Sequence, residues 1–111
     1  MTEGDIILAR IPQADGGGKV RPTILLRQLP GFGDYLACGV STQLKYEIKD
    51  FDFPLMESDE EFTATGLKQS SLARLSFLGV LTQSQVLGKI GCINQAALNT
   101  LRNRLANYIL K

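Results

Sequence analysis

The chain has 111 residues, of which 44 % are hydrophobic and 21 % are charged, and it contains two cysteines and no histidine. This length and composition indicate one globular domain, which we assign to residues 1–111. The lack of histidine excludes imidazole acid–base catalysis, imidazole metal sites, and Ser–His or Cys–His nucleophile pairs. Because no apolar run reaches the ~20 residues of a membrane span and the N-terminus is acidic, we expect a cytoplasmic protein without a membrane partner.

The net charge of +1 hides a separation of charge along the chain. Residues 50–61 contain six Asp and Glu and no base, whereas the other residues carry twelve Lys and Arg against five acids. From residue 66 to the C-terminus there are six bases and no acid. This separation suits a protein that attracts a polyanion to one face, and it is also compatible with an ordinary solvated surface.

The two cysteines, Cys38 and Cys92, each lie in an apolar segment and form no CxxC pair. They are predicted to be buried free thiols. The sequence has no zinc-ligand spacing and no redox motif, so we expect neither a metal nor a cofactor.

Short apolar runs separated by turn residues predict many short strands. Strands are expected at residues 5–10, 23–28, 35–42, 51–53, 71–76, 77–81 and 89–93. The strand at 51–53 is predicted to be an edge strand that ends at Pro54. Residues 82–87 are predicted to form one helical turn closed by Gly88.

Residues 11–20 are predicted to be a long flap, which three consecutive glycines at 16–18 should make mobile. Pro22 cannot donate a ladder hydrogen bond, so it fits the first residue of the following strand. Arg21 is then fixed at the mouth of that strand, beneath the flap, where a guanidinium is well placed to hold a phosphate. The alternative is a surface loop in which Arg21 forms a structural ion pair.

One helix is predicted at residues 95–110, with Asn94 as its N-cap. Apolar residues recur at three- and four-residue steps and form a stripe that should pack on the core; they are Leu98, Leu101, Leu105, Tyr108 and Ile109. Short strands with tight turns and a single terminal helix indicate a mostly β fold, namely a small, strongly bent antiparallel barrel.

Five segments, in order and spread over nearly the whole chain, resemble the MazF/PemK (Kid) family of bacterial toxins. They are residues 4–8 (GDIIL), 18–26 (GKVRPTILL), 40–43 (VSTQ), 66–75 (GLKQSSLARL) and 88–91 (GKIG) before the leucine helix. The resemblance implies an SH3-like barrel homodimer that cleaves single-stranded RNA without a metal. In that reaction a ribose 2′-hydroxyl attacks the adjacent phosphate and leaves a 2′,3′-cyclic phosphate.

The resemblance also implies roles for individual residues. Arg21 falls on the family's Arg-Pro motif and would hold the phosphate and protonate the leaving group. Ser41 falls on a family Thr/Ser position and would donate to a phosphate oxygen. Because arginine is a poor base, the general base stays unassigned. For Ser41 and Thr42 the alternative is a strand-end hydroxyl that caps a turn.

The residues expected to contact RNA are Lys19, Thr42, Gln43, Arg74, Asp15 and Ser76. Arg74 matches a basic position of the family, and Lys19 is a flexible neighbour of Arg21 that should matter less. Many members carry a Glu in the flap, where this chain has only Asp15 nearby. Ser76 stands where members often have Asp or Glu.

The family's toxins are neutralised by a small acidic antitoxin, so the resemblance implies such a partner. Two other functions remain open at this point. Some proteins of the same fold poison DNA gyrase by binding it without nuclease activity, and an SH3-like barrel can also be a simple interaction module.

Overall fold

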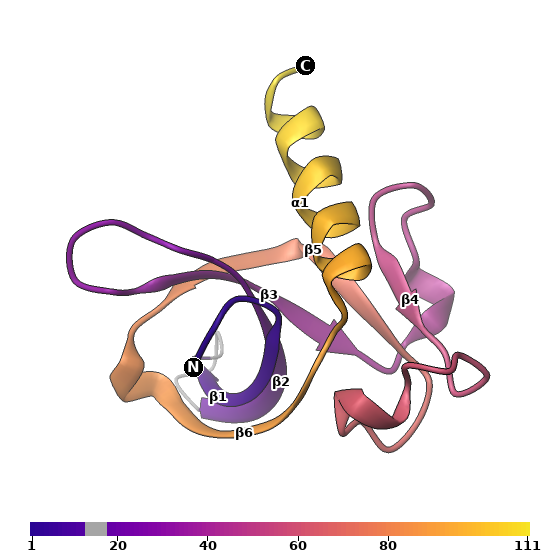
Figure 1. The fold of residues 1–111 in the computed structure, drawn as a ribbon, viewed down its shortest axis with the longest axis horizontal. Coiled ribbons are helices and arrows are strands. Elements are labelled where there is room, and N and C mark those ends of the chain that lie inside the picture. Colours follow the sequence, from indigo (N-terminus) through magenta and orange to yellow (C-terminus); the bar gives the residue numbers. More distant parts are fainter. Residues whose placement is uncertain (13–17) are drawn as a thin grey trace.

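In a computed structural model, residues 1–12 and 18–111 form one curled antiparallel sheet with a single α-helix beside it (Figure 1). The elements are β1 (Asp5–Pro12), β2 (Gly18–Gln28), β3 (Tyr35–Ser41), β4 (Phe53–Leu55), β5 (Ser71–Leu81), β6 (Val86–Cys92) and α1 (Gln95–Ile109), with three 3-10 turns, η1 (Leu44–Tyr46), η2 (Thr63–Thr65) and η3 (Gln83–Gln85). The strand order is β4-β5-β3-β2-β1-β6. This arrangement confirms the predicted mostly β, barrel-like fold with a C-terminal helix.

Alternation of side chains along the strands divides the core into two clusters. On one face, residues such as Ile6, Ile24 and Leu26 pack with the helix. On the opposite face, Ile7 and Leu25 belong to a second cluster. A one-residue shift in any strand would exchange the two sets, so the apolar pattern fixes the register of the sheet.

Helix α1 begins as predicted, because the Asn94 side chain accepts a hydrogen bond from the backbone N–H of Ala97 at 2.8 Å. Its buried residues include Leu98, Leu101 and Leu105, which confirms the first part of the predicted stripe. The last part is wrong: Tyr108 and Ile109 are 57 % and 67 % exposed. The final turn of the helix projects beyond the sheet, so no strand covers it (Figure 1).

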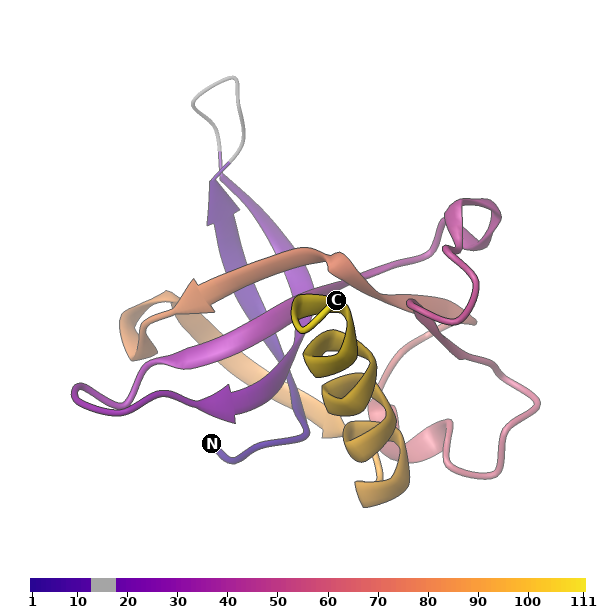
Figure 2. The same ribbon diagram turned by 90° about the horizontal axis from the view of Figure 1, so that it is seen from above.

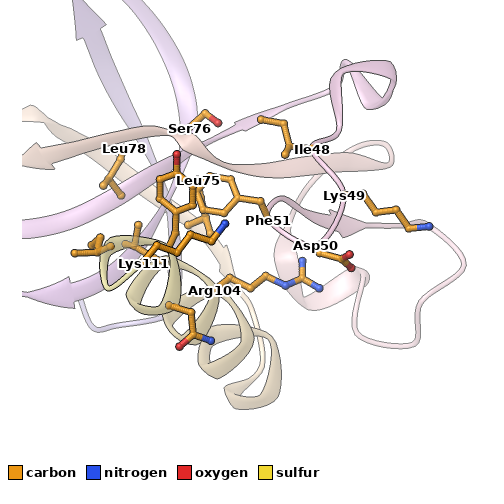
Figure 3. A pocket seen from close by; sticks show the side chains of 13 residues that line it. Ile48, Lys49, Asp50, Phe51, Leu75, Ser76, Leu78, Arg104 and Lys111 are labelled. Atoms are coloured by element: carbon orange, nitrogen blue, oxygen red, sulfur yellow. The ribbon is translucent and has the colours of Figure 1, made fainter.

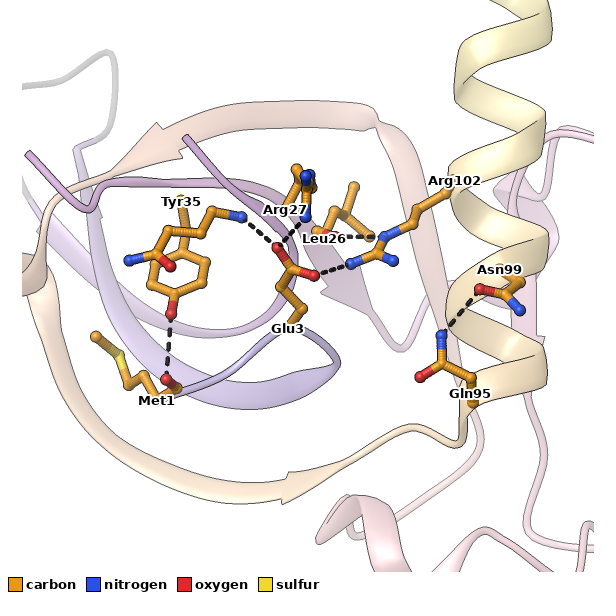
Figure 4. A network of polar contacts seen from close by, with 9 residues as sticks. Met1, Glu3, Leu26, Arg27, Tyr35, Gln95, Asn99 and Arg102 are labelled. Atoms are coloured by element: carbon orange, nitrogen blue, oxygen red, sulfur yellow. Dashed lines mark hydrogen bonds and ion pairs between the residues drawn. The ribbon is translucent and has the colours of Figure 1, made fainter. Parts of the chain in front are cut away.

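A polar network joins the N-terminus to α1 across β2 (Figure 4). The Glu3 carboxylate forms ion pairs with Arg102 of the helix and, at 3.0 Å, with Arg27. It also accepts the backbone N–H of Gln28 at 2.8 Å, while Arg102 Nε donates to the Leu26 carbonyl at 2.7 Å. Arg102 therefore attaches the helix to the sheet.

Strands β1 and β2 continue beyond the rest of the sheet as a projecting hairpin (Figure 2). The predicted flap is therefore too long, because residues 11–12 and 18–20 belong to these strands. The predicted mobility of the flap concerns mainly residues 13–17, which lie outside the described residues. Pro22 is in the middle of β2 and not at its start. It is tolerated because β2 pairs only with β1 until Thr23, where pairing with β3 begins.

Other element boundaries also differ from the prediction. Strand β4 is an edge strand as predicted, but it begins at Phe53 instead of residue 51 and continues through Pro54 to Leu55. The segments expected at 71–76 and 77–81 form the single strand β5, which is bent by a bulge where it pairs with β3. The helical turn at 82–87 is only η3, and β6 starts at Val86.

Turn η2 packs directly on β6 through Gly66 and Gly91, which belong to the family-like segments 66–75 and 88–91. Gly66 has a φ of +71°, and a Cβ at this position would collide with the Ile90 carbonyl. A Cβ on Gly91 would collide with the backbone of Ala64 and Thr65. Close contact between two backbones therefore explains why glycine is needed here. None of the described helices has the length and apolar character needed to cross a membrane.

Candidate active site

Three neighbouring strands place Arg21, Ser41 and Arg74 on one face of the sheet. Thr23 of β2 lies opposite Gly39 of β3, which lies opposite Arg74 of β5. Directly opposed residues of antiparallel strands share a face. Arg21 and Ser41 are each two residues beyond the Thr23–Gly39 pair, so they lie on that same face. The sheet thus places Arg21, Ser41 and Arg74 on the same face, although they are far apart in sequence.

Arg21 is half-buried on the projecting hairpin, opposite the fully buried Ala9. Along residues 18–22, β2 is bonded to β1 alone, so its other edge is open beside Arg21. Within residues 1–12 and 18–111, Arg21 forms no ion pair, which leaves the structural ion-pair alternative without a visible partner. Arg10 of the same hairpin pairs with Val20, so it lies on the opposite face.

Ser41 ends β3 and is also half-buried. Its Oγ accepts a hydrogen bond from the backbone N–H of Gln43 at 3.1 Å. The turn-capping contact weighed for this residue is therefore present. It uses Ser41 as an acceptor only, so the hydroxyl proton remains able to donate to a phosphate oxygen. Thr42 and Gln43 follow as exposed residues.

Arg74 is more confined than its position in a basic stretch suggested. Its side chain is 15 % exposed, and its Nε lies 3.8 Å from the Asp52 carboxylate. Its guanidinium carbon lies 4.2 Å from the centre of the Phe77 ring. Asp52 and Phe77 are thus part of the site's surroundings, and sequence reasoning missed both. The only signal for Asp52 was its position between two phenylalanines, which is unusual for a solvated acid.

The remaining predicted residues are distributed unevenly. Lys19 is exposed on β2, two residues from Arg21 and on its face. Ser76 lies elsewhere: it is exposed at the bulge of β5 and lines a cavity of about 790 Å³ between this strand and the C-terminal half of α1 (Figure 3). Asp15 is outside the described residues.

The thiols offer no nucleophile at this site. Burial, with a smaller effect from the negative charge of Asp52, raises the pKa of Cys38 to about 12, so this thiol stays protonated at neutral pH. Cys92 is also free but only half-buried, which corrects the expectation that both thiols are buried. Among the described residues, no group of three or more Cys, Asp and Glu is arranged to hold a metal ion.

Comparisons with known proteins identify the family and the fold. The sequence profile of the PemK-like, MazF-like toxins of type II toxin–antitoxin systems matches residues 2–109. The structure is similar to that of the Mycobacterium tuberculosis toxin MazF-mt6, with a TM-score of 0.70 and 17 % sequence identity over 95 % of each chain. A search of curated protein sequences gave no match. The fold and the profile define the toxin half of a type II toxin–antitoxin pair, and this chain belongs to the PemK-like, MazF-like family.

Proposed function

We propose that this protein is a metal-independent endoribonuclease toxin that cleaves single-stranded RNA. Members of its family are typically endoribonucleases. The observation that carries the proposal is the position of Arg21, Ser41 and Arg74 on one face of the sheet, with an open strand edge beside Arg21. Two cationic groups and a hydroxyl donor are the groups needed to bind a phosphodiester and stabilise charge on it.

In the proposed reaction the ribose 2′-oxygen attacks the adjacent phosphorus, and the bond from phosphorus to the 5′-oxygen breaks. The products are a 2′,3′-cyclic phosphate and a 5′-hydroxyl. Arg21 stabilises the negative charge on the pentacovalent phosphorane and supplies a proton to the departing 5′-oxygen. Ser41 donates a hydrogen bond to a non-bridging oxygen. The base that takes the 2′ proton stays unassigned, since a guanidinium is already protonated and cannot accept that proton.

Removing the Arg21 guanidinium tests the proposal. The purified protein is incubated with several single-stranded RNAs in EDTA, and Arg21→Ala is expected to lower the cleavage rate by about 10²–10³-fold, as at other sites that lose one preorganised donor. Arg10→Ala is the matched control, because it removes the same charge from the same hairpin on the opposite face. Circular dichroism establishes that both variants are folded.

The outcomes separate the competing functions. Cleavage by the wild type that persists in Arg10→Ala and disappears in Arg21→Ala supports the proposed site. RNA left intact by the wild type in EDTA would overturn the nuclease function. Gyrase inhibition without cleavage would then indicate the gyrase-poison type, and inactivity in both assays an SH3-like interaction module.

As a type II toxin, the protein has an antitoxin as its partner. We propose that this antitoxin is a small acidic protein, whose partly disordered tail folds against the basic residues of the site. Lys19, Arg21 and Arg74 on one face supply the complementary charge. The complex should therefore weaken with rising salt, as titration calorimetry at two ionic strengths would show.

A further inference from the structure

The Arg74 guanidinium is held from two directions. The Asp52 carboxylate lies 3.8 Å from Nε on one side, and the Phe77 ring lies 4.2 Å from the guanidinium carbon on another. Nε is buried and, among the described residues, makes no hydrogen bond. Within the described part of the chain, Nε is the one nitrogen of this side chain that is buried without a partner, so the two terminal nitrogens are the atoms left to bind phosphate oxygens in pairs.

Asp52 is itself fixed in place. It is fully buried, one carboxylate oxygen accepts the Leu75 N–H at 3.1 Å, and the other accepts the Ile48 N–H at 2.9 Å. Leu75 belongs to the bulge of β5, directly after Arg74. A buried carboxylate is stable only when hydrogen bonds and an opposite charge compensate it. Asp52 thus ties the bulge to the loop before β4 and presents a fixed negative charge to Arg74.

We propose that Asp52 is a positioning residue for RNA binding: with Phe77 it holds Arg74 so that the terminal nitrogens face the RNA backbone beside Arg21 and Ser41. This inference rests on the proposed ribonuclease function. A long side chain that is already ordered loses less conformational freedom when RNA binds, so the contact contributes more to affinity. Asp52 does not touch the RNA in this arrangement.

Asp52→Asn distinguishes positioning from a plain charge effect, because the two predict opposite signs. If Asp52 acted only as a negative charge near RNA, removing that charge would strengthen RNA binding and lower KM. Positioning predicts that Arg74 loses its fixed orientation and that KM rises about tenfold, the loss of one charge-assisted hydrogen bond. A merely structural defect would instead reduce the folded fraction, which lowers kcat and leaves KM unchanged.

A double-mutant cycle shows whether Asp52 acts through Arg74. In an Arg74→Ala background, Asp52→Asn should raise KM no further. Asp52→Asn and Arg74→Ala should each reduce the slope of log KM against log salt by about 0.7, the value for one phosphate contact on a single strand. Phe77→Leu is a second variant that leaves the buried carboxylate intact. Phe77 is 53 % exposed, so the fold should tolerate the change, and its effect on KM should also disappear in Arg74→Ala.

Arg104→Met is the matched control. Arg104 Nη1 donates to the Asp52 backbone carbonyl at 2.6 Å, so this change weakens the same loop but leaves the carboxylate beside Arg74. It should lower the unfolding midpoint in urea without changing KM.

If wild-type protein leaves RNA intact, the proposed function fails, and this inference with it. If wild type cleaves RNA but KM in Asp52→Asn is unchanged or lower, only this inference is wrong. The same holds if Asp52→Asn raises KM as much in the Arg74→Ala background as it does in wild type. Should Asp52→Asn not fold, the Phe77→Leu cycle decides alone.

Discussion

A single hydroxyl, that of Ser41, has two tasks in the proposed site. It accepts the Gln43 N–H and so holds the turn after β3, and its own proton remains for a phosphate oxygen. An oxygen with two lone pairs and one proton can do both at once. The structural and catalytic interpretations of this residue are therefore compatible.

Substitutions at Ser41 should separate the two tasks. We expect Ser41→Ala to slow RNA cleavage by about tenfold, less than Arg21→Ala, because a neutral donor contributes less than a charged one and water or Thr42 can partly replace it. Ser41→Thr keeps the hydroxyl and should retain most of the activity. Single-turnover rates at saturating RNA measure this difference. Equal rates for Ser41→Ala and wild type would remove Ser41 from the catalytic set.

At Gly66 the expected effect concerns stability alone. Gly66→Ala should reduce the free energy of unfolding by about 2 kcal/mol or more, since it combines a left-handed backbone with a collision against β6. Gly88→Ala is the control, because a Cβ there meets nothing within 4 Å. Urea denaturation of both variants tests the comparison. Similar losses in the two would show that the η2–β6 contact is looser than described.

Among the elements, helix α1 is joined to the N-terminal segment through the carboxylate of Glu3. The Gln28 N–H, together with hydrogen bonds from Arg102 and Arg27, holds the pKa of Glu3 below its ordinary value of 4.5, and partial burial opposes this only in part. A carboxylate with a lowered pKa stabilises the fold above its unfolded-state pKa and loses this contribution as the pH falls through the folded-state value.

Glu3 should therefore contribute to stability in a pH-dependent way. The difference in unfolding free energy between wild type and Glu3→Gln should be largest near neutral pH and should shrink once the pH falls below 4.5. Urea denaturation over this pH range measures the difference. Glu60→Gln, which changes an exposed acid, should show no such pattern. A constant difference for Glu3→Gln would indicate that the ion pairs with the helix do not form in solution.

The sequence predicted elements wherever a local pattern decides the structure. Asn94 and the leucine spacing placed α1 correctly, and alternating apolar runs placed most strands, because caps and side-chain periodicity act within a few residues. The failures depend on distant partners. Pairing with β1 extends β2 from Pro22 toward the N-terminus as far as Gly18. The burial of Asp52 requires its contacts with Leu75 and Arg74. Helical periodicity shows which side of α1 is apolar but not where the sheet ends, so it did not predict that Tyr108 is exposed.

At the scale of the whole molecule, large apolar side chains remain exposed beside the cavity between β5 and α1. Leu78, Tyr108 and Ile109 line this cavity and are each at least 41 % exposed. The rings of Phe51 and Tyr108, which also line it, pack together with centroids 5.1 Å apart. Apolar clusters of this kind usually mark a protein interface. A second copy of the chain is the occupant we propose, in line with the homodimer expected from the family.

Charge placed in this cluster should break the dimer. We expect wild-type protein to sediment as a dimer at micromolar concentrations and Ile109→Lys to weaken association at least tenfold, because a buried unpaired charge opposes burial of the apolar surface. Phe32→Lys is the control: it changes an even more exposed aromatic residue, located in the turn between β2 and β3. Sedimentation equilibrium distinguishes the two. A strictly monomeric wild type at high micromolar concentration would contradict the homodimer.

The contacts that attach α1 also decide when, during synthesis, the protein can fold. Arg102 bonds to Glu3, 99 residues earlier, and to Leu26, 76 residues earlier. Helix α1, which follows all the strands, also supplies Leu98, Leu101 and Leu105 to the core. A nascent chain on the ribosome therefore has its strands but lacks the residues that close them into a core. We therefore expect the surface formed by β2, β3 and β5 to become rigid only after α1 has left the ribosome, so that the proposed site is completed late in synthesis.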